Sequence, residues 1–422
     1  MNNNSNQPRD FDAVLGGETP PPVTGVVLGG IEGVKNRLKS PEARERASTL
    51  IDALRYQKEG FELVIEALKD PSDKVQMFAA RLLRDKGGQK GKQVLLRHNP
   101  QECFTMLEDW QFETFYPNIG ITSAISTAYN VNLYREEPNS RGGFRVVEDF
   151  NLDALQLFLN DIQVSEVEAL ACWMPDESYL QIYHEECQTL INMLCKASQK
   201  LINLKALFIG DRRQHEYKKS RIFLSDMTSI LEMLPKLEVF KLHGNPYENL
   251  FFKSTYHQYL KNLVLETADN NARTIAQICN LELPSLEYLE LWGGRCRYSP
   301  TNFDYFKTLF SGELVPNLSY LALPSFENTD VIVEALVQSP IIERLAVLDI
   351  SMGTLTDKGA ENLLSCPSVN RLYTLNISKN CISPQMVQQL SQLDCRLIAD
   401  SQEENENYHR GGSASRYYAL YE

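Results

Sequence analysis

The stretch LPSLEYLELWGG, residues 283–294, alternates leucines with aromatic and acidic residues. Leu286, Leu289 and Leu291 fall on the frame L-x-x-L-x-L, in which neighbouring positions of a β-strand point to opposite faces. The leucines are therefore expected in a core, and the side chains between them on the other face of a sheet. On this pattern Trp292 is expected to face solvent.

The same frame recurs along the chain at intervals of 23 to 37 residues, averaging about 29. The first residues of its eight copies are Val167, Leu204, Leu237, Leu260, Leu286, Leu318, Leu345 and Leu372. This spacing is typical of long leucine-rich repeats, in which each strand is followed by a helix. The sequence thus predicts an α/β leucine-rich repeat horseshoe with parallel strands inside and helices outside.

Helical patterns lie between the last frames. Residues 330–339, 356–365 and 383–393 have apolar residues at helical spacing. Thr356 is the expected cap of the second helix, and Ser383 followed by a proline is the expected start of the third.

An all-α block is predicted before the horseshoe. Ser40-Pro41 and Asp70-Pro71 each place a capping side chain before a proline, thirty residues apart. Each is followed by two amphipathic segments, so residues 30–98 resemble two HEAT repeats of the short bacterial type.

These patterns divide the chain into five regions. They are a disordered tether (1–29, with VLGG twice), the HEAT-like block (30–98), a capping segment of short strands and connectors (99–163), the leucine-rich repeat domain (164–399), and an acidic linker with a C-terminal capping strand (400–422). The final strand is expected to seal the edge of the array, with recruitment of a partner as the alternative.

Composition narrows the classes of function. The net charge of the 422 residues is −13, although residues 31–99 alone carry +5, with 15 basic and 10 acidic side chains. The acidic remainder is expected to repel nucleic acid and anionic membranes, and contact of the basic block with nucleic acid is the weakest alternative. The polar N-terminus and the lack of long apolar runs favour a cytoplasmic protein. Nine scattered cysteines argue against a disulfide framework.

No catalytic motif is complete. The chain has neither HExxH nor the G-x-S-x-G elbow. His184 and Cys187 have helical spacing for two metal ligands, but no second pair lies at a usual distance. We therefore predict a protein that is not an enzyme, with no catalytic residue, cofactor or metal.

The alternate positions of the strands predict a partner-binding surface on the concave sheet. The residues expected to form it are Trp173, Phe208, Lys241, Glu266, Tyr288, Glu290, Trp292, Tyr320 and Asp349. Clustered aromatic side chains supply most of the affinity in many protein interfaces. The alternative is that the N-terminal region or the tail of the chain itself covers these rings.

Five stretches resemble bacterial leucine-rich repeat proteins of the ribonuclease-inhibitor-like class. They are LKALFIGD, LVLETAD, LPSLEYLELWGG, SPIIERLAVLDISMGTLTDKG and the closing RYYALYE, over residues 165–422. The N-terminal module resembles one found ahead of HEAT-like helices in cyanobacterial proteins. The repeat architecture and its concave face predict a monomeric scaffold or adaptor that binds a protein partner. As an alternative, the resemblance of the N-terminal module implies an accessory subunit or enzyme of the phycobilin lyase type, acting on antenna proteins.

Overall fold

A computed structural model describes most of the chain. The described residues are 30–123, 126–138, 144–148, 150–174, 184–211, 222–245, 250–267, 270–294 and 304–402. The predicted tether with its two VLGG copies, and the tail from residue 403 onward, lie outside them. The chain divides into two compact units, Met1–Cys103 and Phe104–Glu422.

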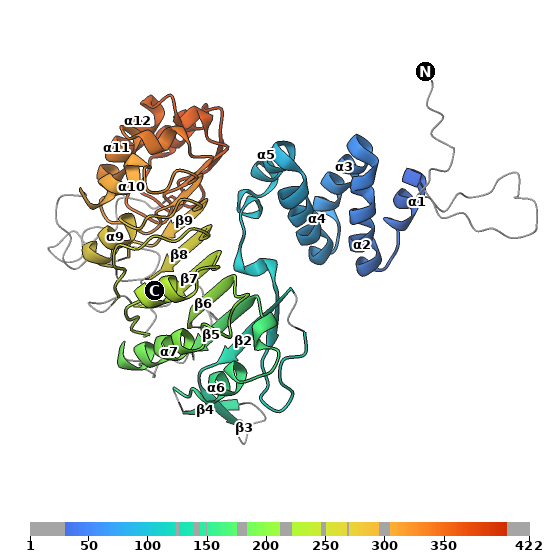
Figure 1. The fold of residues 1–422 in the computed structure, drawn as a ribbon. Coiled ribbons are helices and arrows are strands. Elements are labelled where there is room, and N and C mark those ends of the chain that lie inside the picture. The colour runs from blue at the N-terminus through green and yellow to red at the C-terminus, as the bar shows by residue number, and fades with distance from the viewer. Residues whose placement is uncertain are drawn as a thin grey trace, which may run out of the picture. The chain divides into compact units, whose positions relative to one another are not determined.

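The first unit is helical throughout its described part (Figure 1). Its α-helices are α1 (Gly30–Arg37), α2 (Ala43–Ala53), α3 (Gln57–Glu66), α4 (Asp73–Lys86) and α5 (Gly88–His98). Helix α2 packs on α3 and α4, and α4 packs on α5. Leu50, Val64, Leu83 and Leu95 are fully buried between them, as the apolar spacing predicts.

The two predicted helix starts lie too early in the chain. Helices α2 and α4 begin two residues after the prolines, with Glu42 and Ser72 at the N-cap positions. Ser40 and Asp70 bind the N–H groups of these two residues, at 3.2 and 2.9 Å. The capping side chains therefore stabilise the turn before each helix instead of its first turn.

One ion pair joins the two helix pairs. The guanidinium of Arg46 on α2 donates to both oxygens of Asp70 at 2.9 and 2.8 Å, and to the carbonyl of Ser40 at 2.8 Å. Hydrogen bonding to Arg46 lowers the pKa of Asp70. The planar guanidinium group of Arg46 binds both oxygens of the planar carboxylate of Asp70. This ion pair therefore fixes the register of one helix pair on the next.

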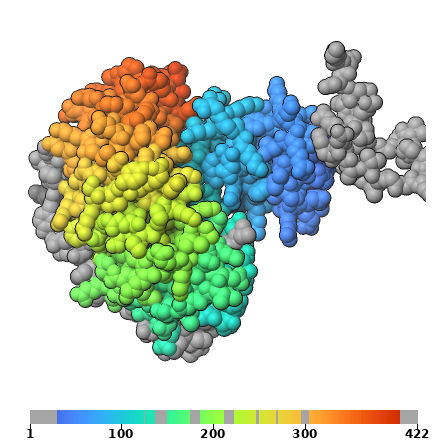
Figure 2. Space-filling model, in the orientation of Figure 1, coloured from blue at the N-terminus to red at the C-terminus, as the bar shows by residue number. Residues whose placement is uncertain are grey.

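The second unit is built on one sheet of 11 parallel strands in the order β1-β2-β5-β6-β7-β8-β9-β10-β11-β12-β13. The strands are β1 (Gln111–Thr114), β2 (Thr127–Asn132), β5 (Ala169–Met174), β6 (Ala206–Asp211), β7 (Val239–His243), β8 (Asn262–Glu266), β9 (Tyr288–Leu291), β10 (Tyr320–Ala322), β11 (Val347–Asp349), β12 (Thr374–Asn376) and β13 (Arg396–Ile398). All eight predicted frames are strands, β5 to β12. Neighbouring strands follow chain order. The surface of this unit accordingly changes from green through yellow to red in Figure 2.

The segment before β5 extends the sheet at its N-terminal edge. Strands β1 and β2 pair in parallel, and β2 pairs with β5. A separate antiparallel pair, β3 (Arg135–Pro138) and β4 (Phe144–Glu148), and helix α6 (Asp153–Leu159) follow β2.

Helices cover one face of the sheet (Figure 1). They are α7 (His184–Lys196), α8 (Thr228–Met233), α9 (Ala272–Cys279), α10 (Lys307–Ser311), α11 (Thr329–Val337), α12 (Asp357–Ser365) and α13 (Pro384–Leu390). The frame leucines of the strands lie in one continuous core that also contains the apolar side chains of these helices. Repetition of a strand and a helix therefore produces a repeat-like α/β fold.

Acidic residues at the helix starts join the last repeats. Asp330 of α11 accepts hydrogen bonds from the N–H and the hydroxyl of Thr356, at 2.8 and 2.6 Å, and Asp357 of α12 accepts from the N–H of Ser383 at 2.8 Å. The hydroxyl of Ser383 accepts from Met386, so the predicted cap of α13 is confirmed. Thr356 holds the predicted N-cap position of α12, but its hydroxyl donates to Asp330 and makes no capping bond to an N–H of its own helix.

A buried asparagine closes the last of these turns. The amide group of Asn380 donates to the carbonyls of Ile350 and Ile377, at 2.9 and 3.0 Å, and its oxygen accepts from the N–H of Leu355. Gly353 lies against Asn380. A Cβ added at Gly353 would stand 2.5 Å from the hydroxyl oxygen of Thr329. The stretch GTLTDKG thus has a structural role in stacking repeats.

Within the described part of the chain, no helix has the length and apolar character needed to cross a membrane.

Candidate functional site

The nine predicted site residues share one face of the sheet, opposite the leucine core. The pairing register places them in three rows across the strands. One row contains Tyr288 and Tyr320, the next contains Phe208, Lys241, Glu290 and Asp349, and the third contains Trp173 and Glu266, with Trp292 directly after β9. We call this surface the strap face, because residues 104–110, named the strap below, lie on it.

Exposure separates the nine residues into two groups. The buried group consists of Phe208, Glu266, Tyr288, Trp292 and Tyr320. The half-buried group consists of Trp173, Lys241, Glu290 and Asp349. The expectation that Trp292 faces solvent is wrong, because its side chain is only 8 % exposed.

Residues 104–110, here named the strap, cover the aromatic part of this face. The ring of Phe104 packs edge-on against Tyr288 and Tyr320, with centroid distances of 5.5 and 5.4 Å. The two tyrosine rings are stacked 4.2 Å apart. Phe104 is 1 % exposed, so the aromatic surface is filled by the chain's own side chain.

Leu107 and Trp110 anchor the other end of the strap. They form a cluster of buried residues with a floor of small side chains, Ala128, Ala169, Ala171 and Ala206, and with Phe208 and Val239. The indole Nε1 of Trp110 donates to Glu168 at 3.2 Å. The alanines leave the space that the two large side chains fill.

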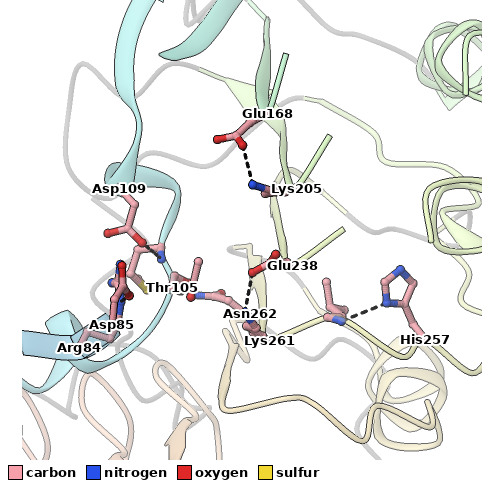
Figure 3. A network of polar contacts seen from close by, with 12 residues as sticks. Arg84, Asp85, Thr105, Asp109, Glu168, Lys205, Glu238, His257, Lys261 and Asn262 are labelled. Atoms are coloured by element: carbon pink, nitrogen blue, oxygen red, sulfur yellow. Dashed lines mark hydrogen bonds and ion pairs between the residues drawn. The ribbon is translucent and has the colours of Figure 1, made fainter. Parts of the chain in front are cut away.

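Polar contacts hold the middle of the strap (Figure 3). The amide of Asn262 on β8 donates to the carbonyl of Thr105 at 3.1 Å and lies 2.8 Å from the sulfur of Met106. Lys241 on β7 lies 3.9 Å from the carboxylate of Glu108. The strap thus crosses the sheet from β10 to β2 before it turns into β1.

Alternating charges border the strap on one side (Figure 3). The residues directly before successive strands pair as Glu168 with Lys205 at 2.5 Å and Glu238 with Lys261 at 2.6 Å. These side chains are one quarter to two fifths exposed. The row links neighbouring strands and provides the acceptor for Trp110.

Glu290 binds two of the predicted aromatic residues at once. One carboxylate oxygen accepts from the hydroxyl of Tyr288 at 2.5 Å, and the other accepts from the indole of Trp292 at 2.6 Å. Burial, and then the charge of Glu290, raises the pKa of Tyr288 well above its ordinary value. The tyrosine is therefore a neutral donor, and the three side chains form a fixed unit.

Beyond the strap, the face is polar. Asp349 on β11 accepts from the amide of Asn376 on β12 at 2.8 Å and from the N–H of Ser351 at 2.9 Å. Asn376 accepts in turn from the N–H of Ser378. Burial raises the pKa of Asp349. These half-buried groups are the part of the face that keeps polar atoms at the surface.

The strap residues Phe104, Leu107 and Trp110 were not predicted from the sequence. The alternative that the chain covers its own rings is confirmed, but the covering residues belong to the predicted capping segment and not to the N-terminal region or the tail. The sequence did contain one signal of a covered surface, the small residues at outward positions of β5 and β6. A sheet surface that faces solvent does not require alanine at such positions on neighbouring strands. Trp173, half-buried, contacts Phe112 of β1 at a centroid distance of 6.3 Å.

The described residues offer no metal centre. Among them, no group of three or more His, Cys, Asp or Glu side chains could hold a metal ion. Cys187 is buried, which raises the pKa of its thiol to about 12, and the side chain of His184 lies outside the described part. The eight described cysteines are free thiols.

Comparisons with known proteins identify a similar fold. No protein-family model matches the chain, and no curated protein matches it. Among solved structures, a crystal structure of a Bacteroides fragilis protein, a structural genomics target, is similar with 28 % sequence identity and a TM-score of 0.50. The match covers 58 % of this chain and 69 % of that protein.

Proposed function

We propose that the chain is a non-enzymatic scaffold or adaptor that binds another protein on the strap face. In this proposal the second unit is a leucine-rich repeat horseshoe, the first is a pair of HEAT-like repeats, and the strap face is the concave sheet. The protein would act in the cytoplasm, without cofactor or metal.

The repeat assignment is supported by the turns after two of the strands, β7 and β12. Asn245 and Asn380 both stand three residues after the last leucine-type residue of a frame, the position where leucine-rich repeats carry asparagine. Both are buried. Strands β10, β11 and β12 start at Tyr320, Val347 and Thr374, an even spacing of 27 residues.

The observation that carries the binding proposal is the strap itself. An irregular segment is held on a preformed sheet by an aromatic side chain, a leucine and a tryptophan, with one asparagine binding its backbone. Protein interfaces are stabilised in the same way, by a few buried anchors on a rigid surface. The sheet has its strand partners already in place, so it can bind such a segment with little ordering of its own.

The half-buried residues would take part in recognition around the strap. Lys241 and Asp349 supply charges of opposite sign, and Trp173 supplies an aromatic surface near β1. Charges at the border of an interface mainly change the association rate and the choice of partner. These residues are therefore the ones to vary when the fold must stay intact.

The test is affinity capture from extract of the source organism, with mass spectrometry. The full chain is compared with a Lys241→Glu, Asp349→Asn variant and with Val331→Ser, an exposed residue of α11 on the helix side. A protein captured by the wild type and the control but lost from the double variant supports the proposal. Equal capture by the wild type and both variants, each folded by circular dichroism, rejects the strap face as the site.

The phycobilin lyase alternative and the nucleic-acid alternative rest on the first unit alone, and both stay predictions. Absorbance titration with a linear tetrapyrrole tests the former. Binding to DNA or RNA that weakens with added salt would support the latter.

A further inference from the structure

We infer that the ligand of the strap face is a protein segment of the form aromatic-x-x-Leu-x-x-Trp with an acidic residue before the tryptophan, seated as the strap is seated. The inference rests on the proposed function and names its ligand class. The strap, with Phe104, Leu107 and Trp110 three residues apart, is then a resident copy of that ligand.

The first anchor selects an aromatic ring. Tyr288 and Tyr320 stand stacked on neighbouring strands, and Phe104 meets both edge-on. The carboxylate of Glu290 fixes the hydroxyl of Tyr288, so the subsite keeps its shape. Edge-to-face packing favours an aromatic side chain over an aliphatic one at this position.

The second and third anchors select by size and by one hydrogen bond. The alanine floor of β2, β5 and β6 leaves room for a leucine and an indole side by side. Glu168 accepts the indole N–H, and a phenylalanine ring would leave that acceptor without this bond. The third position is therefore expected to require tryptophan.

The two acidic residues between these anchors have one role each. The carboxylate of Asp109 accepts from the N–H of Met106 at 3.0 Å, which closes the 3₁₀ turn Leu107–Asp109 that brings Leu107 and Trp110 to the same side. Glu108 lies 3.9 Å from Lys241. An acidic segment thus matches both the turn and the charge of the face.

The strap is held in a manner that allows exchange. The backbone N–H groups of Asp109 and Trp110 donate within the strap, to the carbonyls of Met106 and Leu107. The strap is not a strand of the sheet, so its removal leaves every strand pair in place. Its attachment to the same chain gives it an effective concentration of about millimolar, and a free segment must compete with this.

The experiment uses a fluorescent peptide of residues 104–111, FTMLEDWQ, with the full chain. Fluorescence anisotropy is measured for the wild type and for a Phe104→Ser, Leu107→Ser, Trp110→Ser variant, in which the strap has lost its anchors. The variant is expected to bind at least about 100-fold more tightly than the wild type, since the competing cis segment is gone. A peptide with Trp replaced by Phe is expected to bind more weakly than the parent peptide.

A matched control variant fills the space above the alanine floor. Adding Ala206→Leu to the anchor-free variant should abolish peptide binding, because the leucine occupies the space of the indole. No binding by a folded anchor-free variant overturns the inference, as does binding that Ala206→Leu leaves unchanged.

A second measurement tests the inference on the wild-type chain, in case the anchor-free variant does not fold. The same peptide, with benzoyl-phenylalanine at its first position, is photocrosslinked to wild-type chain at millimolar peptide. Crosslinks to Tyr288 or Tyr320 support the inference, and crosslinks elsewhere or none overturn it. If the peptide does not bind while affinity capture of a partner still depends on Lys241 and Asp349, this ligand class is wrong and the proposed function stands. Failure of both rejects the function itself.

Discussion

Two regions of the strap face use the same strand frame for opposite purposes. Over β5 and β6 the outward side chains are mainly alanines, and the chain's own Leu107 and Trp110 fill the space above them. Over β11 and β12 the outward side chains include Asp349 and Asn376, which bind each other and remain half-buried. The leucine frame fixes where a strand lies, whereas the residues between the leucines decide whether its other face is covered.

The largest effect is expected where the cover is anchored. Trp110→Ala should lower the unfolding free energy of the second unit by about 3–5 kcal/mol, since it leaves a cavity above the alanine floor and removes the indole hydrogen bond to Glu168. Chemical denaturation followed by circular dichroism measures the change. Leu157→Ala, at a side chain 52 % exposed, is the control and should cost less than about 0.5 kcal/mol. Equal losses would show that the strap is not packed on the floor.

Overfilling the floor should have a smaller effect. Ala206→Leu is expected to destabilise the unit by about 1–3 kcal/mol and to increase hydrogen exchange in residues 104–110, because the added side chain displaces Leu107 or Trp110. Ala276→Leu, on the half-buried side of α9, is the control. Unchanged exchange in the strap would contradict the packing described for this region.

Breaking the polar region should cost less again. Asn376→Ala removes the donor to Asp349 and the acceptor for Ser378, so a loss of about 1 kcal/mol is expected in thermal denaturation. The strap should keep its hydrogen-exchange protection in this variant. Loss of that protection would mean that the two regions of the face are coupled.

The smallest effect is expected in pH dependence, with opposite signs in the two units. Burial raises the pKa of Asp349, so its contribution is fully present below the unfolded value of about 3.9 and is lost as pH rises through the folded pKa. The pKa of Asp70 is lowered by Arg46, so its contribution is present above about 3.9 and is lost as pH falls through the folded pKa.

Segment-resolved hydrogen exchange between pH 3 and pH 6 can measure the pH dependence of stability separately for the segments around Asp349 and Asp70. Asp349→Asn should flatten the dependence near β11, and Asp70→Asn should flatten it near α2 and α4. The same sign of slope in both segments would refute the assignment of these two carboxylates.

The sequence predicted the strands because one spacing recurs eight times and each copy buries leucines at the same positions. It did not predict the strap, since a single crossing of a sheet has no period. The bulk of Leu107 and Trp110 is complementary to the small residues of β5 and β6, but these lie more than fifty residues later in the chain. The cap assigned to Thr356 failed for a similar reason, because its partner Asp330 belongs to the preceding repeat.

The strap has a consequence for the order in which the chain folds during synthesis. Thr105 binds Asn262, which follows it by 157 residues, and Phe104 binds rings on strands that come still later. At about 5–20 residues per second, a ribosome needs roughly 8–30 s to reach Asn262 after it has made the strap. Leu107 and Trp110 find their alanine floor once β6 exists, whereas Phe104 has no ring partner until β9 and β10 exist, so closure of the Phe104 end is a late step of folding. For those seconds the nascent chain exposes Phe104, the kind of apolar side chain that chaperones bind.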